Sequence, residues 1–215
     1  TELLLDSSRP VPAAVSPDVT LGPTAGRASF FNPFGIVTSL RVGGGFPVSL
    51  GPGRSPLVGS EAGVLARDGV APVVGLRSGG DVAFGGEPGS RYAAVQRAER
   101  VAYTVADGVR VVTVPPPGGA PVEVAAVAAE ETDTAALALD SDGRTLYLGG
   151  ATGVQAVDVE TGIVRWSFRV GTVRRLTVSR DRIGYVTGSR IGVLTADGEE
   201  VASASGSVSQ DFTVL

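Results

Sequence analysis

The chain has 215 residues, a net charge of −4 and no histidine, cysteine or methionine, and all 18 of its basic residues are arginines. Histidine, lysine and cysteine supply most general bases, covalent nucleophiles and transition-metal ligands, so this composition argues against an enzyme, a metal site or a bound cofactor. The acidic balance excludes a general attraction to nucleic acid, and no apolar run reaches the roughly 18 residues that a membrane span needs.

Glycine and proline indicate the fold class. The 31 glycines and 14 prolines make up nearly twice their usual share of roughly 12%. Such a composition favours many tight turns over long helices. We therefore expect an all-β protein that buries a core without disulfides, and the absence of cysteine leaves its compartment open.

Residues 1–51 are predicted to form an extended N-terminal arm, and residues 52–215 the main domain. Eight of the 14 prolines lie in residues 1–56, and proline removes the N–H donors that a long central strand needs. Four phenylalanines gather in the same stretch: Phe30, Phe31, Phe34 and Phe46. They are candidates either to cap the following sheet or to dock the arm onto a neighbouring subunit.

Residues 134–170 contain the clearest pattern of the chain, which predicts an antiparallel meander of four strands. The expected strands are residues 135–139, 145–148, 154–159 and 163–170. Turn residues such as Asp142-Gly143 and Thr161-Gly162 separate them, and glycine supplies the positive φ that tight hairpins require.

Similar units recur along the chain, which is typical of repeat proteins. The segment that begins at Tyr147 aligns with segments that begin at Tyr103 and Tyr185, and a fourth copy begins at Leu57. The spacing of these positions matches the roughly 40 to 50 residues of a four-stranded propeller blade.

The repeat resembles a known group of proteins. Thr145-Leu-Tyr-Leu-Gly-Gly followed by Gly153-Val-Gln-Ala-Val-Asp158 and Arg165-Trp166 is similar to a blade of the quinoprotein-like and YVTN-type β-propellers. The resemblance is strongest at residues 134–170 and implies blade geometry. It does not carry over active-site residues, because that group includes both cofactor-dependent dehydrogenases and non-catalytic scaffolds.

Two other interpretations stay open at this point. A β-sandwich produces a similar rhythm of hairpins, and the alanine-rich residues 93–103 and 122–131 are compatible with helices. We interpret both segments as strands. The fold class predicted is therefore all-β, with about five propeller-like meander blades and a Pro/Gly-rich N-terminal arm.

Ring closure poses a separate question, because four recognisable blades occupy about residues 52–206. An open ring exposes strand edges, which propellers avoid by closing. One solution is a fifth blade shared by the termini, with residues 211–215 pairing against strands from the first fifty residues. The rival solution is a partner chain that covers the edge.

Arginines concentrate between residues 165 and 190. Period-two alternation in Arg165-Trp166-Ser-Phe168-Arg169 places the two arginines on one face and the aromatic rings on the other. Together with the phenylalanines, the candidate interaction surface contains Arg165, Arg169, Arg174 and Arg175. The arginines suit a carboxylate, a phosphate or an acidic protein surface. The alternative is a solvated strand face balanced by nearby acids.

Asp140 and Asp142 have the spacing of the first ligands of a calcium loop. No bidentate glutamate follows at the loop spacing, because position 151 is alanine. An Asp-Gly hairpin explains these residues more simply.

These features predict a non-catalytic structural or protein-interaction scaffold within a larger assembly, such as a phage virion or tail or a bacterial surface complex. The expected partners are other protein subunits, with no nucleic acid, no cofactor and no membrane span. Exclusive use of arginine over lysine hints at GC-rich coding. A carbohydrate- or small-ligand-binding propeller module is the alternative, and a hydrolase that uses carboxylates alone is the third possibility.

Overall fold

The computed structural model of the chain describes twenty β-strands and the turns between several of them. It describes the backbone of residues 19–21, 27–31, 36–41, 48–52, 58–60, 63–67, 73–76, 82–86, 92–94, 100–113, 119–128, 136–179 and 181–205. Side-chain environments are described for residues 82–86, 100–113, 119–128, 136–179 and 181–205. The expectation that residues 93–103 and 122–131 contain strands is confirmed at β10 and β12, which belong to the sheets below.

The strands form five four-stranded sheets, each a meander in which sequential strands pair antiparallel. We call the sheets blades 1 to 5. Blade 1 contains β1 (Val19–Leu21), β2 (Arg27–Phe31), β3 (Ile36–Arg41) and β4 (Val48–Pro52). Blade 2 contains β5 (Val58–Ser60), β6 (Gly63–Arg67), β7 (Val73–Leu76) and β8 (Val82–Gly85). Blade 3 contains β9 (Tyr92–Ala94), β10 (Arg100–Val105), β11 (Gly108–Thr113) and β12 (Glu123–Ala128). Blade 4 contains β13 (Ala136–Leu139), β14 (Thr145–Gly149), β15 (Gly153–Asp158) and β16 (Val164–Arg169). Blade 5 contains β17 (Arg175–Ser179), β18 (Arg182–Val186), β19 (Arg190–Thr195) and β20 (Glu200–Ser205).

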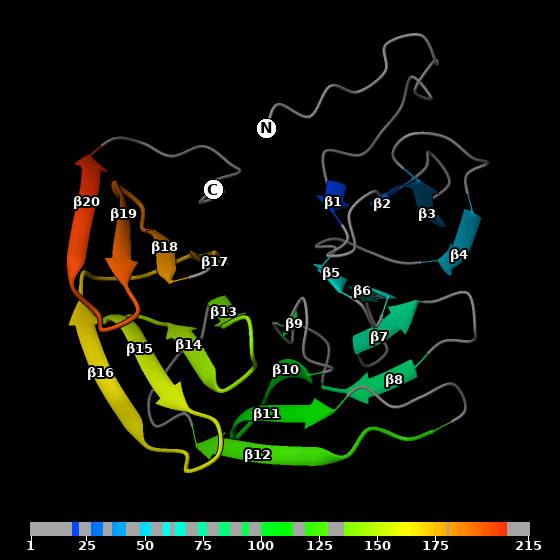
Figure 1. The fold of residues 1–215 in the computed structure, drawn as a ribbon, viewed down its shortest axis with the longest axis horizontal. Helices are drawn as coiled ribbons and strands as arrows, with labels where there is room; N and C mark the ends of the chain where they lie inside the picture. The colour runs from blue at the N-terminus through cyan, green and yellow to red at the C-terminus, as the bar shows by residue number, and fades with distance from the viewer. Residues whose placement is uncertain are drawn as a thin grey trace, which may run out of the picture.

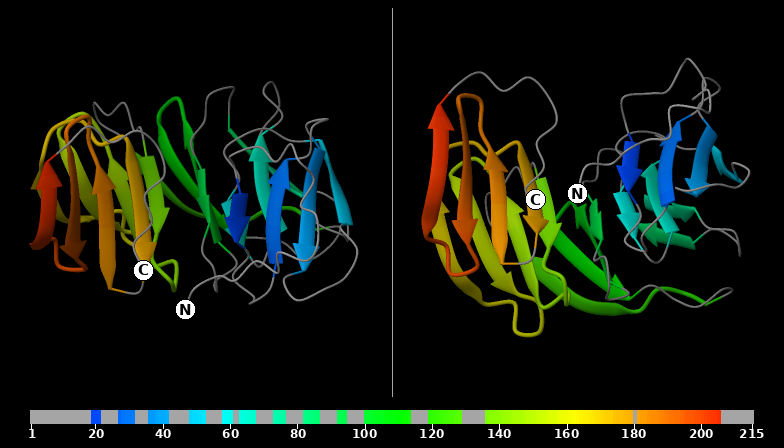
Figure 2. Two further views of the ribbon diagram at one scale, coloured as in Figure 1. Left: turned by 90° about the horizontal axis from the view of Figure 1, so that it is seen from above. Right: turned by 45° about the horizontal axis from the view of Figure 1, so that its top comes forward.

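The five blades stand around a common axis, as in a β-propeller (Figure 1). The first strand of each blade lies innermost, and these strands contact one another in the order β1, β5, β9, β13 and β17. β17 and β1 make no contact of comparable extent, and both views in Figure 2 show the described strands of blades 5 and 1 apart from each other. The described strands therefore form an open arc.

Every blade contains a register shift between its third and fourth strands. In blades 3, 4 and 5 the shift follows the fourth residue of the third strand, which is Val111, Ala156 or Val193. One residue of the outer strand is unpaired at each of these bulges. A bulge increases the local twist of an edge strand, and its recurrence at one position shows that these blades are copies of the same unit.

Apolar side chains fill the spaces between neighbouring blades. One cluster lies between blades 3 and 4 and includes Val111, Leu146 and Leu148. A second lies between blades 4 and 5 and includes Ala156, Ile183 and Tyr185. Burying one such large side chain stabilises the fold by about 1.5 to 3 kcal/mol, so packing between blades is what holds the arc together.

The N-terminal region differs from the sequence expectation. Residues 1–51 were predicted to form an extended arm that could contribute strands to a shared blade. Among the described strands, β1 to β4 pair with one another and form blade 1. These strands are short, and Pro52 is the one proline of this region that lies in a described strand, at the end of the outermost strand β4. An edge position tolerates proline because its missing N–H is not needed for pairing. Residues 211–215, expected to complete a shared blade, lie outside the described residues.

Two details of the predicted repeat also need correction. Leu57-Val-Gly59-Ser was aligned with the second strand of a blade, but Val58–Ser60 forms the first strand of blade 2, and Gly63–Arg67 forms the second. Asp-Gly and Gly-Val turns look alike at every hairpin of a meander, so turn residues alone do not fix which strand of the blade is which.

The second correction concerns Tyr147. In blade 3, Val105 pairs with Gly108 at the hairpin between the second and third strands. At the equivalent hairpin of blade 4, the Gly150 N–H donates to the Gly153 carbonyl at 3.0 Å. By this pairing Leu148, not Tyr147, occupies the position of Tyr103. A shift of one residue turns a side chain to the opposite face of a strand, and Tyr147 accordingly packs on the blade 5 side of its sheet.

Candidate interaction surface

Arg165 lies at the bulge of β16 and is occupied within its own blade. Its guanidinium forms a short ion pair with Asp158 and donates to the Thr145 hydroxyl at 3.1 Å. The hydrogen bond from Arg165, helped by the N–H and hydroxyl of Thr161, lowers the pKa of Asp158 to about 2. The alternation predicted for this strand is confirmed, because Arg165 and Arg169 are exposed and Trp166 and Phe168 are half-buried.

Trp166 lies between blades 4 and 5. Its ring stands 5.9 Å from that of Tyr147, and its indole N–H donates to the Ala196 carbonyl of blade 5 at 2.7 Å. Gly198 makes room for the ring, since a Cβ there would approach Trp166 Cδ2 to 2.6 Å. Trp166 therefore binds the two blades together.

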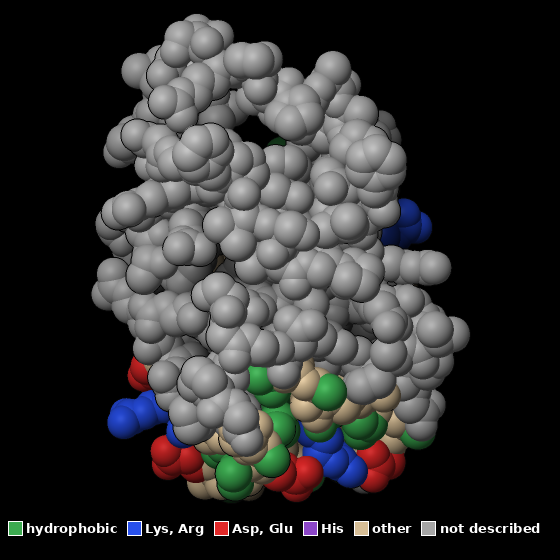
Figure 3. Space-filling view, turned by 90° about the vertical axis from the view of Figure 1, so that its right-hand side faces the viewer, with side chains coloured by type: hydrophobic (Ala, Val, Ile, Leu, Met, Phe, Trp, Pro, Cys, Tyr) green, Lys and Arg blue, Asp and Glu red, His purple; other side chains and the backbone are tan. Residues whose placement is uncertain are grey.

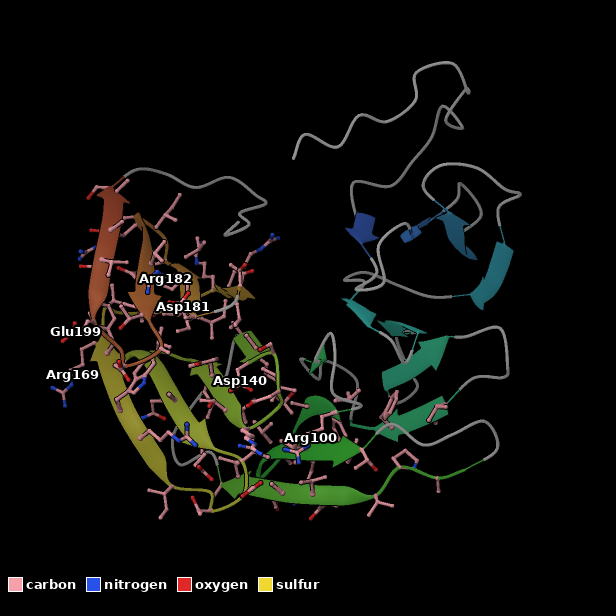
Figure 4. The ribbon with its side chains drawn as sticks, in the orientation of Figure 1. Arg100, Asp140, Arg169, Asp181, Arg182 and Glu199 are labelled. Atoms are coloured by element: carbon pink, nitrogen blue, oxygen red, sulfur yellow. The ribbon has the colours of Figure 1, made fainter. Side chains whose placement is uncertain are left out.

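The other candidate arginines occupy two different places. Arg169 ends the outer strand β16 and points away from the ring in Figure 4. Arg175 begins the innermost strand β17 and Arg174 precedes it. The Arg174 side chain passes beside Gly188, and the backbone N–H of Arg174 donates to the Val186 carbonyl at 2.8 Å. The structure thus distributes these arginines over an outer rim and an inner strand, and does not gather them into one patch.

The phenylalanines of the candidate surface fall in less fully described parts of the chain. Phe30 and Phe31 lie in β2, where only the backbone is described. Phe34 and Phe46 lie outside the described residues. Their proposed contacts therefore stay predictions.

The Asp140 to Gly143 segment forms the β13–β14 hairpin. The Gly143 N–H donates to the Asp140 carbonyl at 3.2 Å, the Arg144 N–H donates to Asp142 Oδ1 at 3.0 Å, and Gly143 has a φ of 72°. Burial raises the pKa of Asp140, whose Oδ1 has no hydrogen-bond partner. No three acidic side chains converge as a metal site among the described residues.

The same hairpin connects blade 4 to its neighbour. Arg100, which begins β10 of blade 3, donates from Nη1 to the Gly143 carbonyl at 2.7 Å (Figure 4). A charged donor on a turn carbonyl is a stronger bond than a neutral pair. Blade 4 is therefore joined by polar bonds as well as apolar contacts to the blades on both of its sides.

A tyrosine and a glutamate occur at matching positions of blades 3 and 5. In blade 5 the Tyr185 hydroxyl forms a short hydrogen bond with Glu200, and Arg190 donates to the other oxygen of that carboxylate at 2.6 Å. Burial and then Glu200 raise the pKa of Tyr185. The Tyr185 ring crosses Gly192, where any Cβ would collide with it, and lies 5.7 Å from Phe168 of blade 4.

Blade 3 repeats this arrangement more loosely. Burial and then Glu123 raise the pKa of Tyr103, and the Arg110 Nε lies 3.5 Å from Glu123 Oε2. Both tyrosines face the preceding blade. In blade 3 the Tyr103 hydroxyl oxygen lies so close to Gly85 of blade 2 that a Cβ at Gly85 would be only 2.7 Å from it. These charges serve the contacts between blades.

The opposite face of blade 5 is different, because no described blade follows it. In the third strands of blades 3 and 4, the residues that face the next blade are fully buried, with Val111 and Ala156 both at 0% exposure. Val193 occupies the matching position in blade 5 and is only half-buried, as is Ile191. We call this surface the free face of blade 5. The register of the strands places the following residues on it: Arg175, Thr177, Arg182, Gly184, Val186, Ile191, Val193, Ala202 and Ala204.

Sequence reasoning missed the free face. Most of its residues are small or aliphatic, so they have the same appearance as the core positions of any blade; Arg175 and Arg182 are the charged residues among them. Phase-corrected alignment of the repeats places Ala202 and Ala204 where blade 4 has Trp166 and Phe168 and blade 3 has Ala125 and Val127. The size of these side chains therefore does not show which blade lacks a described neighbour.

The visible surface charge is mixed. In Figure 3 arginine, acidic and hydrophobic side chains alternate over the described part of the view, and no patch of a single charge forms there. In the described portion of the chain, no helix is long and apolar enough to cross a membrane.

Comparison with known proteins supports the fold. No family model matches the chain, and no curated protein matches it by sequence. Among solved structures, a chain of the mitotic checkpoint complex aligns with a TM-score of 0.63 at 12% identity, over 96% of this chain and 72% of that one. The Cps50 (Swd1) β-propeller domain of Myceliophteria thermophila aligns with a TM-score of 0.62 at 16% identity, over 84% of this chain and 65% of that one.

The chain therefore has the fold of a β-propeller. It spans less than two thirds of the Cps50 (Swd1) domain. Likeness at these identities establishes the architecture, and the β-sandwich interpretation is excluded by the arrangement of the five sheets around one axis.

Proposed function

We propose that this protein is a non-catalytic scaffold that binds other protein subunits within a larger assembly. The observation that carries the proposal is the free face of blade 5, where Ile191 and Val193 are half-buried although the matching residues of blades 3 and 4 are fully buried. Apolar surface of this kind is typical of protein interfaces. A fold shared with a chain of the mitotic checkpoint complex supports the same class of function.

The side chains available also support a scaffold. The chain has no histidine, cysteine or lysine, and three of the described carboxylates, Asp142, Asp158 and Glu200, are engaged in a turn or in ion pairs. The resemblance of residues 134–170 to quinoprotein-like and YVTN-type blades also supports a scaffold, because many members of that group are non-catalytic scaffolds. The setting we propose is a phage virion or tail, or a bacterial surface complex, on the strength of the arginine-only composition.

Native mass measurement of the protein isolated from its source tests the proposal. A scaffold is expected in a particle well above the 21.7 kDa of one chain, together with at least one other protein. A particle of 21.7 kDa that persists at the concentration found in the source would overturn it.

A further inference from the structure

We propose that Asp197-Gly198, in the hairpin between β19 and β20, is a site of spontaneous covalent modification at which the aspartate converts to isoaspartate. The reaction needs no enzyme and no cofactor. The inference goes beyond the proposed scaffold function and does not depend on it, because it rests on the geometry of one hairpin.

The reaction joins the side chain of the aspartate to the next backbone nitrogen. The Gly198 nitrogen attacks the carboxyl carbon of Asp197, and a C–N bond forms while the amide hydrogen and the carboxyl OH leave as water. The product is a cyclic imide. Water then opens the imide at either carbonyl: cleavage of the new bond restores aspartate, and cleavage of the original peptide bond leaves isoaspartate. A following glycine favours the attack because it has no Cβ beside the nitrogen.

The sequence contains four pairs that could react in this way, and their aspartates are Asp68, Asp107, Asp142 and Asp197. The first lies outside the described residues. The other three lie in hairpins of blades 3, 4 and 5. The sequence makes these three pairs alike, and the structure separates them by two properties: whether the carboxylate is held, and whether the glycine is buried.

The carboxylates of blades 3 and 4 are held in place. Arg110 donates to both oxygens of Asp107 at 2.9 and 3.0 Å, and the Arg144 N–H donates to Asp142 Oδ1 at 3.0 Å. The hydrogen bond from Arg110 also lowers the pKa of Asp107, which reduces the share of the neutral acid that can lose its OH group. Asp197 is exposed, and its carboxylate makes no hydrogen bond or ion pair with the described residues.

The three glycines differ in the same order. Gly108 and Gly143 are buried, whereas Gly198 is half-buried. Gly108 belongs to β11 and pairs with both neighbouring strands, and the Gly143 carbonyl accepts a hydrogen bond from Arg100 at 2.7 Å. Gly198 lies between two strands, and its N–H donates to the Thr195 carbonyl at 3.0 Å. Opening that single turn bond frees the attacking nitrogen without breaking strand pairing.

Isoaspartate at position 197 should weaken the contact between blades 4 and 5. The turn accepts the Trp166 indole N–H at the Ala196 carbonyl, and Gly198 lies against the same ring. Isoaspartate inserts a side-chain carbon into the backbone between Ala196 and Gly198, so the turn cannot keep both contacts with the ring. We therefore expect the modified chain to unfold at a lower urea concentration than the unmodified chain.

Incubation of the full chain at neutral pH tests the inference. One sample stays folded and a second is unfolded in urea, and peptide mapping with electron-transfer fragmentation measures isoaspartate at positions 107, 142 and 197. The rate at each site in the folded chain is divided by its rate in the unfolded chain, which removes the effect of local sequence. The ratio at Asp197 should exceed the other two at least about threefold, the factor for releasing an exposed carboxylate from a partner.

Two variants, each checked for folding by circular dichroism, sharpen the test. Asp197→Glu retains the charge but lengthens the side chain, so it should abolish modification at this position. Arg110→Ala frees Asp107 and should raise the ratio there about threefold, while the ratio at Asp197 stays unchanged.

A folded chain without isoaspartate at position 197, or a ratio there no higher than at Asp107 and Asp142, overturns the inference even if neither variant folds. An unchanged ratio at Asp107 in Arg110→Ala overturns the protection assigned to a held carboxylate. These readings come from single peptides of one chain, so they are independent of whether the protein binds other subunits.

Discussion

Blades 4 and 5 share the same strand order, the same bulge and the same hairpins, but they have different surroundings. Blade 4 has a neighbour on each side, and all residues of β13 and β14 are buried. Blade 5 has a described neighbour on one side only, and the residues of β17 and β20 are half-buried or exposed. Two sheets of nearly the same design therefore differ in their surroundings: blade 4 lies between two described blades, and blade 5 has a described blade on one side only.

This difference indicates that the blades are stabilised chiefly by packing between sheets. Hydrogen bonds within blades 4 and 5 are alike, yet the matching positions Ala156 and Val193 differ in burial. Substitutions at matched positions should therefore have unequal effects in the two blades.

The largest difference is expected for a charge at the matched third-strand position. Ala156→Asp places a carboxylate at a position of 0% exposure with no cationic partner, and should lower the free energy of unfolding by about 3 to 5 kcal/mol. Val193→Asp should lower it by about 1 kcal/mol, because water reaches the side chain. Urea titrations of both variants check this. Equal losses would show that the free face is covered in the isolated chain.

Loss of Trp166 should have the next largest effect. Trp166→Ala removes the ring between blades 4 and 5 and should destabilise the chain by about 3 kcal/mol. Trp166→Phe retains most of the packing and loses the hydrogen bond to Ala196, at about 1 kcal/mol. Denaturation followed by circular dichroism measures both, and exposed Ile163→Ala is the control, expected within about 0.5 kcal/mol of wild type.

Alkaline pH should weaken the contacts between blades. Burial raises the pKa of Tyr147 to about 12 and also raises that of Tyr185. Above pH 10 the unfolded chain loses phenolic protons that the folded chain keeps, so stability falls as the pH rises from 10 to about 12, by at most about 1.4 kcal/mol per pH unit for each tyrosine. Unfolding free energies between pH 8 and 12 check the slope, and Tyr147→Phe should reduce it. A stability curve flat to pH 12 would contradict the burial of these hydroxyls.

The smallest effect is expected at the Arg165 to Asp158 pair on the surface of blade 4. Arg165→Ala should change stability little, because exposed ion pairs contribute weakly. It should raise the pKa of Asp158 from about 2 towards its ordinary value, since the hydrogen bond from Arg165 is the main cause of the lowered value. In wild type the contribution of Asp158 is present above pH 4 and is lost as the pH falls towards 2. Carboxyl NMR titration measures the shift, and Arg169→Ala should leave it unchanged.

The sequence predicted the meander at residues 134–170 almost strand for strand, because glycine turns and alternating side chains are local properties of the chain. It also predicted the exposed arginine face of β16. It did not predict blade 1, where proline-rich connections obscure strands of three to six residues, or the position of Tyr147. A one-residue slip is invisible to turn spacing and is settled only by the pairing of strands.

By itself the sequence determined that this protein is all-β and built from repeated hairpins, because composition and turn chemistry act within a few residues. Which apolar residues are core and which are surface is seen only in the tertiary structure, because it depends on the neighbouring sheet. Val111, Ala156 and Val193 are chemically similar and occupy the same position of three blades, and what separates them is whether another sheet stands beside them.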